Sequence, residues 1–255
     1  MKKYLLSALC LLFSGMAIHA QILVMDIIQV KEGMEADYEA VEAFVSPIQE
    51  AAVAQGRKLG WFVFKRLSGG DLTVIKDRGI GDYMLINVYK DEAQRAADDW
   101  NDYTAIAQKV YKGKMRTAKI DRRMATLIEP RKDTRTYVLE NIYFTKAHRT
   151  VLGDTISVFP AQQLNEDYEQ YEMEVFRPVF EDMILAGAHR MWHFNRIVLR
   201  SENAYQNLTH IIFNKTAKGS YTAPEDFKTS KLMELGIKAR KGFDVGLMKL
   251  ILFQR

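Results

Sequence analysis

The sequence predicts an α+β fold in which two tandem β-α-β-β-α-β units pack sheet against sheet. The first observation behind this prediction is a repeat that runs from an Asp-Tyr-Glu triplet to a tryptophan over one helix-sized window. Its members in the first copy are Asp37, Tyr38, Glu39, Glu42, Pro47, Glu50, Gly56 and Trp61; those in the second are Asp167, Tyr168, Glu169, Glu172, Pro178, Glu181, Gly187 and Trp192. One extra residue precedes Pro178 in the second copy. A repeat of this size indicates one architectural unit used twice.

The second observation is that the expected strands are apolar on both faces. In the first of them, Met25 and Ile27 alternate with Ile28 and Val30, and the segment 61–64 is Trp-Phe-Val-Phe. Side chains alternate between the two faces of a strand, so a sheet of such strands must bury both faces. Helices can cover one face. Packing the two sheets against each other covers the other face, and this predicts a barrel-like core between the units.

The chain opens with the pattern of a secretory signal peptide. Met1-Lys2-Lys3 precedes an apolar run from Tyr4 to Ala17, and small residues end the leader at Ala20. The run is shorter than the roughly 20 residues that cross a bilayer, which favours a cleaved leader over a membrane anchor. A lipoprotein cut before Cys10 is less favoured, because the hydrophobic region ahead of that cysteine would be unusually short. We therefore predict a leader at 1–20, units at 21–132 and 133–255, and an exported protein, periplasmic or extracellular.

Composition narrows the function classes. The only cysteine, Cys10, leaves with the leader, so the mature chain can form no disulfide and no thiolate metal site. The formal net charge of +4 falls by two when Lys2 and Lys3 are removed, which argues against a nucleic-acid partner. The basic stretch 109–123 is expected to be a solvated surface, with an anionic partner as the alternative.

The elements of the first unit follow from hydrophobic period and boundary residues. Branched residues between Ile22 and Val30, ended by a turn at 31–33, predict a strand. Apolar residues at three- and four-residue spacing predict a helix from Met34 to Gln55, kinked or interrupted at Pro47 and stopped by Gly56. The remaining expected elements are strands at Trp61–Phe64 and Tyr83–Tyr89, a helix at Asp91–Val110 and a strand at Met124–Ile128.

The second unit repeats this order. Its expected strands are Tyr137–Phe144, Trp192–Leu199, Leu208–Asn214 and Leu247–Phe253, and its expected helices are Asp167–Ala186 and Phe227–Lys238. The segment Thr145–Leu164, which contains Gly153 and Pro160, is interpreted as an insertion before the first of these helices. Two right-handed crossovers then give each unit one antiparallel sheet with both helices on one face.

This duplicated pattern, in which a helix ends at a glycine and Trp61 or Trp192 opens the next strand, resembles the dimeric α/β-barrel superfamily in a fused, single-chain form. The resemblance covers nearly the whole mature chain and implies two tandem ferredoxin-like units that form a pseudo-dimeric barrel. The superfamily includes antibiotic-biosynthesis-type monooxygenases, haem-degrading enzymes, NIPSNAP-like proteins and chlorite dismutase relatives. The resemblance therefore implies a fold and leaves the function open.

The same resemblance makes haem the one cofactor to consider. Haem-degrading members place an Asn, a Trp and a His around the porphyrin, and Asn141, Trp192 and His210 are the same residue types. No other cofactor is predicted. No metal site is predicted either, because His189 and His193 straddle a helix-to-strand junction and zinc requires three or four well-placed ligands.

The candidate ligand-binding residues lie in the second unit. His193 and Asn195 share one face of a strand, and His210 and Asn141 on other strands are expected to join them. Trp192 is included as a possible ligand contact, with a core anchor as its alternative role. The first unit has apolar residues at the corresponding positions, namely Phe62, Phe64, Leu85 and Ile27. A polar patch in an apolar barrel suits a small-ligand pocket, unless these groups lie at strand ends and meet water.

Other motifs exclude more than they suggest. The sequence contains no Gly-rich phosphate loop, no HExxH and no Gly-x-Ser-x-Gly, which argues against nucleotide enzymes and common hydrolases. The repeat carboxylates Glu39, Glu42, Glu169 and Glu172 are expected to be solvated, because charged residues are rarely buried.

These observations predict an exported protein that holds an apolar or aromatic small molecule between its two sheets, with no assigned reaction. One alternative is an oxidoreductase, either a cofactor-independent monooxygenase of electron-rich aromatic substrates or a haem-handling enzyme. The other alternative is a structural protein with a filled barrel. The expected partner is a small molecule, without nucleic acid and without a membrane segment once the leader is removed. The fused pseudo-dimer is expected to be a monomer or to assemble further through barrel edges.

Overall fold

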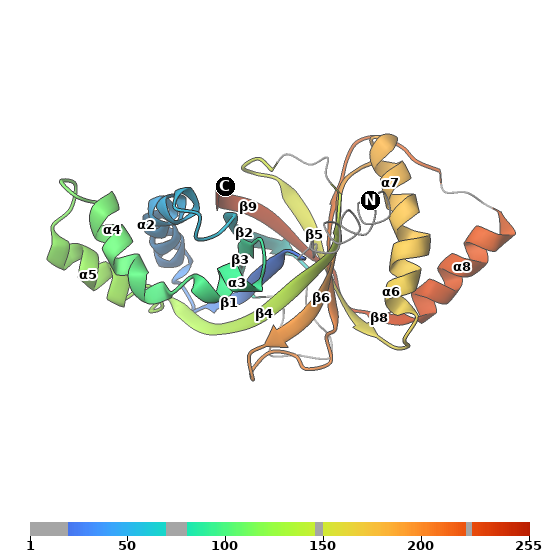
Figure 1. The fold of residues 1–255 in the computed structure, drawn as a ribbon, viewed down its shortest axis with the longest axis horizontal. Coiled ribbons are helices and arrows are strands. Elements are labelled where there is room, and N and C mark those ends of the chain that lie inside the picture. Colours follow the sequence, from blue (N-terminus) through green and yellow to red (C-terminus); the bar gives the residue numbers. More distant parts are fainter. Residues whose placement is uncertain (1–19, 70–80, 146–149, 223–225) are drawn as a thin grey trace, which may run out of the picture.

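The computed structural model describes residues 20–69, 81–145, 150–222 and 226–255, so the predicted leader lies outside the described residues except for Ala20. Within these ranges a central barrel of strands carries helices on two opposite sides (Figure 1). The helices cover the outside of the barrel. Its interior is left to side chains of the strands and of the loops that join them.

The strands are β1 (Ile22–Val30), β2 (Gly60–Ser68), β3 (Tyr83–Tyr89), β4 (Arg131–Phe144), β5 (Thr155–Gln163), β6 (His189–Arg200), β7 (His210–Thr216), β8 (Arg240–Gly242) and β9 (Gly246–Gln254). The first helical group contains α2 (Glu35–Ala54), α3 (Glu92–Ala97), the 3₁₀ turn η1 (Trp100–Asp102), α4 (Tyr103–Val110) and α5 (Thr117–Ala125). The second contains α6 (Tyr168–Tyr171), the π turn η2 (Glu172–Phe176), α7 (Arg177–Leu185) and α8 (Phe227–Lys238).

Eight strands of the described chain close into an antiparallel barrel. Hydrogen-bonded neighbours follow the order β4-β1-β3-β2-β9-β5-β7-β6, and β6 pairs with β4 to complete the ring. The short strand β8 pairs with β5 beside β9. This α+β barrel confirms the predicted fold class at the level of architecture.

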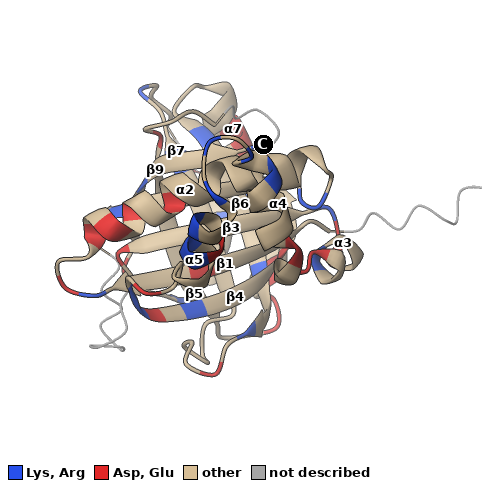
Figure 2. Ribbon diagram, turned by 90° about the vertical axis from the view of Figure 1, so that its left-hand side faces the viewer, with Lys and Arg blue, Asp and Glu red and all other residues tan. Residues whose placement is uncertain are grey.

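The apolar faces of the strands explain why the barrel closes. One set of side chains fills the interior and includes Met25, Ile27, Leu139 and Phe213. The alternate set, with Ile28 and its neighbours, packs outward against the first helical group, and a third cluster packs against the second group. Figure 2 shows α2, α4 and α5 in front of the sheet, with most charges on helices and loops rather than on the strands.

The long helix α2 runs from Glu35 to Ala54 without interruption at Pro47, where a kink or break was predicted. The predicted helix Asp91–Val110 is instead divided into α3, η1 and α4. Asp98 lies at the first division, where its carboxylate faces Lys58 Nζ at 3.1 Å and accepts a hydrogen bond from Tyr103 at 3.0 Å. The spacing of apolar residues did not reveal this division of the helix, at which the buried ion pair between Asp98 and Lys58 lies.

The predicted strand Met124–Ile128 is wrong. The chain there forms the end of α5 and the turn that follows it. Ile120, Met124 and Leu127 recur at helical spacing and face the core beneath the first helical group. A short apolar run does not distinguish a strand from a helix, which explains the wrong prediction.

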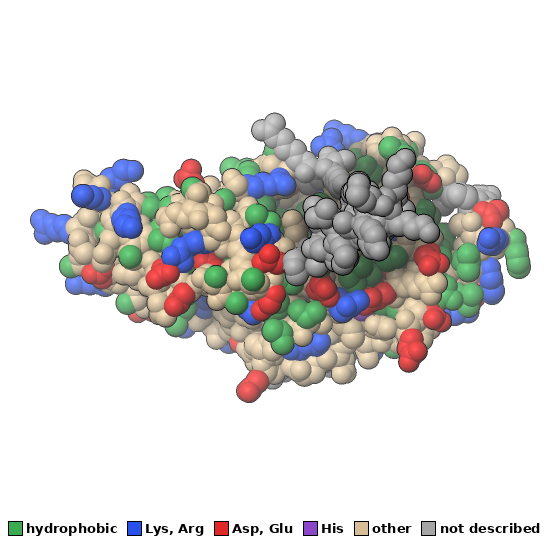
Figure 3. Space-filling view, viewed as in Figure 1, with side chains coloured by type: hydrophobic (Ala, Val, Ile, Leu, Met, Phe, Trp, Pro, Cys, Tyr) green, Lys and Arg blue, Asp and Glu red, His purple; other side chains and the backbone are tan. Residues whose placement is uncertain are grey.

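The basic stretch 109–123 around this helix is solvated, as was predicted. The exposed basic residues of this region are Lys109, Lys112, Lys114, Arg116, Lys119, Arg122 and Arg123. Figure 3 shows Lys and Arg side chains gathered at that end of the molecule.

The fourth barrel strand in chain order is β4, and it contains the segment Tyr137–Phe144 that was predicted to open the second unit. It pairs with β1 through residues 131–140. The segment Thr145–Leu164, interpreted as an insertion, contains β5 instead. A proline is unusual in a central strand, because it has no N–H to donate to a neighbouring strand. Pro160 is tolerated in β5 because it lies between residues 155–158, which pair with β9, and residues 161–163, which pair with β8.

The extra residue in the second repeat has a structural counterpart. Where α2 is a regular helix, the second copy divides into α6, the π turn η2 and α7. A π turn accommodates one additional residue within a helix. The turn spans Glu172–Phe176, immediately before Arg177 and Pro178, where the repeat gains its residue.

Glu42 and Glu172 were predicted to be solvated, and this is wrong for both. Their exposed fractions are 1% and 0%. Arg131 lies 3.2 Å from Glu42, and Arg240 contacts Glu172 in the other half. Each arginine comes from a distant strand, so the sequence around the repeat did not reveal the partner that makes the burial tolerable.

The buried Glu172 predicts a pH dependence of stability. Burial raises its pKa from 4.5 to about 7 despite the contact with Arg240. The folded state therefore binds more protons than the unfolded state between these values, and the free energy of unfolding should fall as the pH rises through this window. Glu172→Gln should flatten that decline, as measured by urea unfolding at a series of pH values. Parallel wild-type and variant profiles would show that Glu172 does not titrate in this way.

Candidate functional site

A cavity of about 310 Å³ lies inside the barrel. Its apolar lining comes from both halves of the ring: Leu23, Leu59, Phe62, Phe64, Ile86, Val88, Phe144, Ile156, Met191, Phe213 and Leu250. Its polar lining is formed by Gln21, Asn141, Thr145, Thr150, Asp154, His193 and Arg255. A pocket of this size and composition falls at the lower end of the range for small-molecule sites.

Strand alternation explains which side chains reach the cavity. On β6, Met191 and His193 line the cavity and Ile197 belongs to the interior core. The side chains between them, including Trp192 and Phe194, belong to the core beneath the second helical group. The predicted division of this strand into two faces is therefore confirmed.

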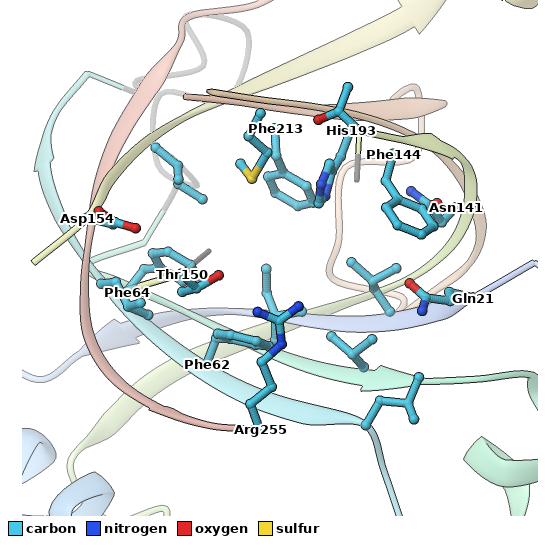
Figure 4. A pocket seen from close by; sticks show the side chains of 18 residues that line it. Gln21, Phe62, Phe64, Asn141, Phe144, Thr150, Asp154, His193, Phe213 and Arg255 are labelled. Carbon is cyan, nitrogen blue, oxygen red and sulfur yellow. The ribbon is translucent and has the colours of Figure 1, made fainter. Parts of the chain in front are cut away.

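The walls combine aliphatic side chains with the rings of Phe62, Phe64, Phe144 and Phe213 (Figure 4). Phe62 stacks in parallel with Phe253, with 6.1 Å between the ring centroids. Phe144 and His193 form an edge-to-face contact, with 5.8 Å between their centroids. Rings of this kind favour offset-stacked or edge-to-face contacts. The phenylalanine rings that line the cavity therefore offer apolar surfaces and edges to a flat aromatic ligand.

Polar groups enter the cavity from opposite walls. Figure 4 shows the His193 imidazole and the Arg255 guanidinium pointing into the same space, with Asn141 and Gln21 at one side. Asp154 lies at the other side, where it pairs with Lys215. The cavity therefore offers a cation and amide groups within walls that are otherwise mostly apolar.

Asn195 fixes the neighbouring Asn141. The Asn141 amide donates a hydrogen bond to Asn195 Oδ1 at 2.8 Å, and the Asn195 amide donates to the Ile211 carbonyl at 3.0 Å. Asn195 is fully buried, and Asn141 is the one of the two that lines the cavity. The structure thus brings together three of the predicted residues, His193, Asn195 and Asn141.

The other two predicted residues lie on the opposite face of the sheet. His210 Nε2 donates a hydrogen bond to Glu169 at 3.0 Å, and the imidazole stacks on Phe194 at 5.1 Å between centroids. Burial lowers the pKa of His210 below its ordinary value. Trp192 is fully buried and stacks on Phe180 at 5.2 Å, as a core anchor does. Neither side chain lines the barrel cavity.

This separation bears on haem. Asn141 faces the barrel interior, whereas Trp192 and His210 face the second helical group. The three residues that the resemblance suggested cannot surround one porphyrin. The residues present do not fit that group, and no chemistry through haem follows from them.

Sequence reasoning missed Arg255, which a bulge turns inward. Val63 pairs with Leu252 and Phe64 with Leu250, so β9 carries one extra residue at this point. Leu250 and Phe253 consequently both belong to the interior side, although simple alternation would separate them. No feature of the sequence indicates the bulge.

Two further findings concern metal-binding groups and membrane-spanning helices in the described chain. Across the described ranges, no three His, Cys, Asp or Glu side chains gather as a group that could hold a metal ion. Among those same residues, no helix combines the length and the apolar character needed to cross a membrane.

The closed antiparallel barrel with helices on two sides has the fold of the dimeric α/β-barrel superfamily. A candidate monooxygenase from Lactobacillus acidophilus NCFM superposes with a TM-score of 0.54 at 10% identity, covering 92% of this chain and 96% of that one. One from Fusobacterium nucleatum subsp. nucleatum ATCC 25586 gives 0.54 at 9% identity, covering 93% and 95%. An anthrone oxidase-like protein gives 0.50 at 10% identity, covering 92% and 93%. No family model and no curated protein matches the sequence.

Proposed function

We propose that the barrel binds a small aromatic molecule that carries an acidic or phenolic oxygen. The observation that carries this proposal is the cavity itself, in which apolar walls that include four phenylalanine rings surround His193, Asn141 and Arg255. Burying an aromatic ring contributes through its apolar area, and stacking on the walls adds about 0.5–1.5 kcal/mol. The guanidinium and the imidazole then favour a ligand whose oxygen is an anion or a hydrogen-bond acceptor.

Alizarin, a coloured anthraquinone with phenolic groups, is a suitable probe. Calorimetry should detect its binding to the wild-type protein, and unsubstituted anthraquinone should bind more weakly. Arg255→Gln and His193→Ala should each weaken alizarin binding by roughly tenfold, the effect of losing one charge-assisted or strong hydrogen bond. Equal affinities for wild type and both variants would contradict the proposal, as would the absence of binding.

The second candidate function is oxygenation of such a molecule without a cofactor. Two observations favour it: His193, a potential base, faces an aromatic-walled cavity, and two similar structures are described as candidate monooxygenases. An anthrone would lose a proton to the imidazole and react as its enolate with O₂. One oxygen atom becomes the new carbonyl of the quinone and the other leaves as water, so the reaction needs no external reductant.

Anthrone and an oxygen electrode separate this candidate from binding alone. An oxygenase should consume one O₂ for each quinone formed, well above the spontaneous rate, and His193→Ala should lower kcat more than it raises KM. If alizarin binds but anthrone oxidation stays at the spontaneous rate, the protein is a binding protein.

We also infer that the barrel is a fused pair of ferredoxin-like units. Supporting this inference, the halves of the ring have the same strand order, β4-β1-β3-β2 and β9-β5-β7-β6. Glu39 accepts hydrogen bonds from Lys65 and Tyr83, both at 2.7 Å, and Glu169 meets Arg196 and His210 in the same way at 2.6 and 3.0 Å.

We place the junction of the two units between β4 and β5, because a boundary at 132/133 would divide β4. A crystal structure in which the two halves do not superpose would contradict this arrangement. A fused pair should also sediment as a monomer. The leader pattern further supports export, and N-terminal sequencing of the secreted protein should then begin at Gln21.

A further inference from the structure

A second cavity, of about 500 Å³, lies outside the barrel between the first helical group and the sheet. Its floor is formed by the outward side chains of β1, β2 and β3, and its roof by α2. The floor residues are Asp26, Trp61, Leu85, Asn87 and Tyr89, and the roof residues are Val41, Glu42, Val45 and Gln49. Trp100 and Ile128, which are 51% and 69% exposed, line the cavity where it meets solvent.

The lining contains buried polar atoms that have no partner. Within the described part of the chain, nothing bonds to the indole nitrogen of Trp61, to Gln49 Oε1 or to Arg131 Nε. Trp61 and Gln49 are 0% and 3% exposed. Buried polar groups in folded proteins are usually satisfied, so these atoms give the cavity hydrogen-bonding capacity that a ligand or an ordered water can meet. The set includes two donors and one acceptor.

The charges of the lining do not balance locally. Lys58 lies 3.1 Å from Asp98, and Arg131 lies 3.2 Å from Glu42, so each cation already has an anion. Asp26 accepts a hydrogen bond from the Thr136 hydroxyl at 2.6 Å, and among the described residues it has no ion pair. Burial raises the pKa of Asp26, although the Thr136 hydrogen bond and the charges of Arg131 and Lys58 act in the opposite direction.

The second half shows which residue occupies the position that corresponds to Asp26. Trp61 and Asn87 pair across β2 and β3, as Trp192 and Asn214 do across β6 and β7. By the same registers Asp26, opposite Leu85 on β3, corresponds to Phe159, opposite Ile212 on β7. Phe159 packs against the apolar core beneath the second helical group. A carboxylate therefore occupies a position that an aromatic side chain fills in the other half.

We propose that this helix-side cavity binds a small organic cation, an ammonium or amidinium group on an apolar body, with Asp26 as the counterion. The cation places its charge against the Asp26 carboxylate and can donate a further hydrogen bond to Gln49 Oε1. Its apolar body contacts Val41, Val45 and Leu85, and the Trp100 indole at the opening can cover it. A ligand carboxylate would instead meet three acidic side chains, Asp26, Glu42 and Asp98, with both nearby cations already paired.

Phenethylamine, phenethyl alcohol and phenylacetate form a suitable probe set. Their apolar bodies are similar, and at neutral pH they are a cation, a neutral molecule and an anion, respectively. Two of the three tryptophans, Trp61 and Trp100, line the helix-side cavity, so intrinsic fluorescence reports on it directly. Calorimetry supplies the affinities. The amine should bind at least tenfold more tightly than the alcohol or the acid, because a charge-assisted hydrogen bond to a buried carboxylate is lost in both.

Three variants locate the site. Asp26→Asn keeps the shape of the side chain and should weaken phenethylamine at least tenfold, while Val41→Phe should block the cavity from its roof. Val88→Phe fills the barrel cavity instead and should leave phenethylamine binding unchanged. Near-ultraviolet circular dichroism establishes that each variant is folded.

Several outcomes would overturn the proposal: no saturable phenethylamine response, equal binding of the amine and the alcohol, or retained affinity in both Asp26→Asn and Val41→Phe. Loss of amine binding in Val88→Phe would assign the amine to the barrel. Since the proposal does not depend on the function of the barrel, failure of alizarin to bind would leave it intact.

Discussion

Replacing Arg240 with leucine should lower the free energy of unfolding by about 3 kcal/mol or more, the cost of leaving one partner of a buried ion pair uncompensated. The variant leaves Glu172, which is fully buried, without its cation. It also removes the guanidinium that lies over the rings of Phe176 and Phe159, at 5.1 and 5.3 Å from their centroids. Urea unfolding with an unchanged m-value measures the loss.

An exposed ion pair supplies the control for Arg240→Leu. Arg196, whose side chain is 44% exposed, pairs with Glu169 and Glu140, so Arg196→Leu should cost less than about 1 kcal/mol. The double variant Arg240→Leu/Glu172→Leu should recover much of the loss, because it removes the stranded charge. Equal effects of Arg240→Leu and Arg196→Leu would show that burial of the pair is not what matters.

Trp192→Ala should destabilise the protein by about 3–5 kcal/mol, the range for removing a large buried aromatic side chain. The indole is fully buried and stacks on Phe180 and Phe194, at 5.2 and 5.9 Å between centroids. Trp100→Ala is the matched control, because Trp100 is 51% exposed and its truncation should cost far less. Similar shifts in the urea midpoint for the two variants would contradict the assignment of Trp192 as a core anchor.

The repeat and the two-sided apolar strands were sufficient to predict the barrel. The tryptophans that end both repeat windows are fully buried behind the sheet, one in each half. Strands with apolar residues on both faces require two covers, and the structure provides helices outside and the opposite strands inside. These properties are local to each strand, which is why the sequence alone reveals them.

Long-range pairing accounts for what the sequence did not reveal. Residues 124–128 are apolar enough for a strand, and their contacts with the helical group make them the end of a helix and a turn. The strand β5 was not predicted because it contains Pro160. Only the folded sheet shows that this proline lies at the gap between the pairing of β5 with β9 and its pairing with β8. Glu42 and Glu172 are buried only because arginines from distant strands reach them.

The sequence predicted those site residues whose position follows from the alternation of side chains between the two faces of a strand. His193, Asn195 and Asn141 meet on the interior side because each lies on the expected face of its strand. His210 was expected to join them, but it lies on the face of β7 that packs toward the helices, as does Tyr83, the residue at the corresponding register position of β3. Arg255 reaches the cavity only through the bulge in β9. Register and bulges are set by pairing between strands, so neither error could be corrected from one strand's sequence.

The central claim is that the barrel cavity is a binding site, and titration of alizarin into Val88→Phe tests it most directly. Val88 lines the barrel cavity from β3, whereas Val41 lines the helix-side cavity from α2. A phenylalanine at position 88 should fill the barrel space and weaken alizarin binding at least tenfold, and Val41→Phe should leave it unchanged. Unchanged alizarin affinity in a folded Val88→Phe variant would contradict the claim.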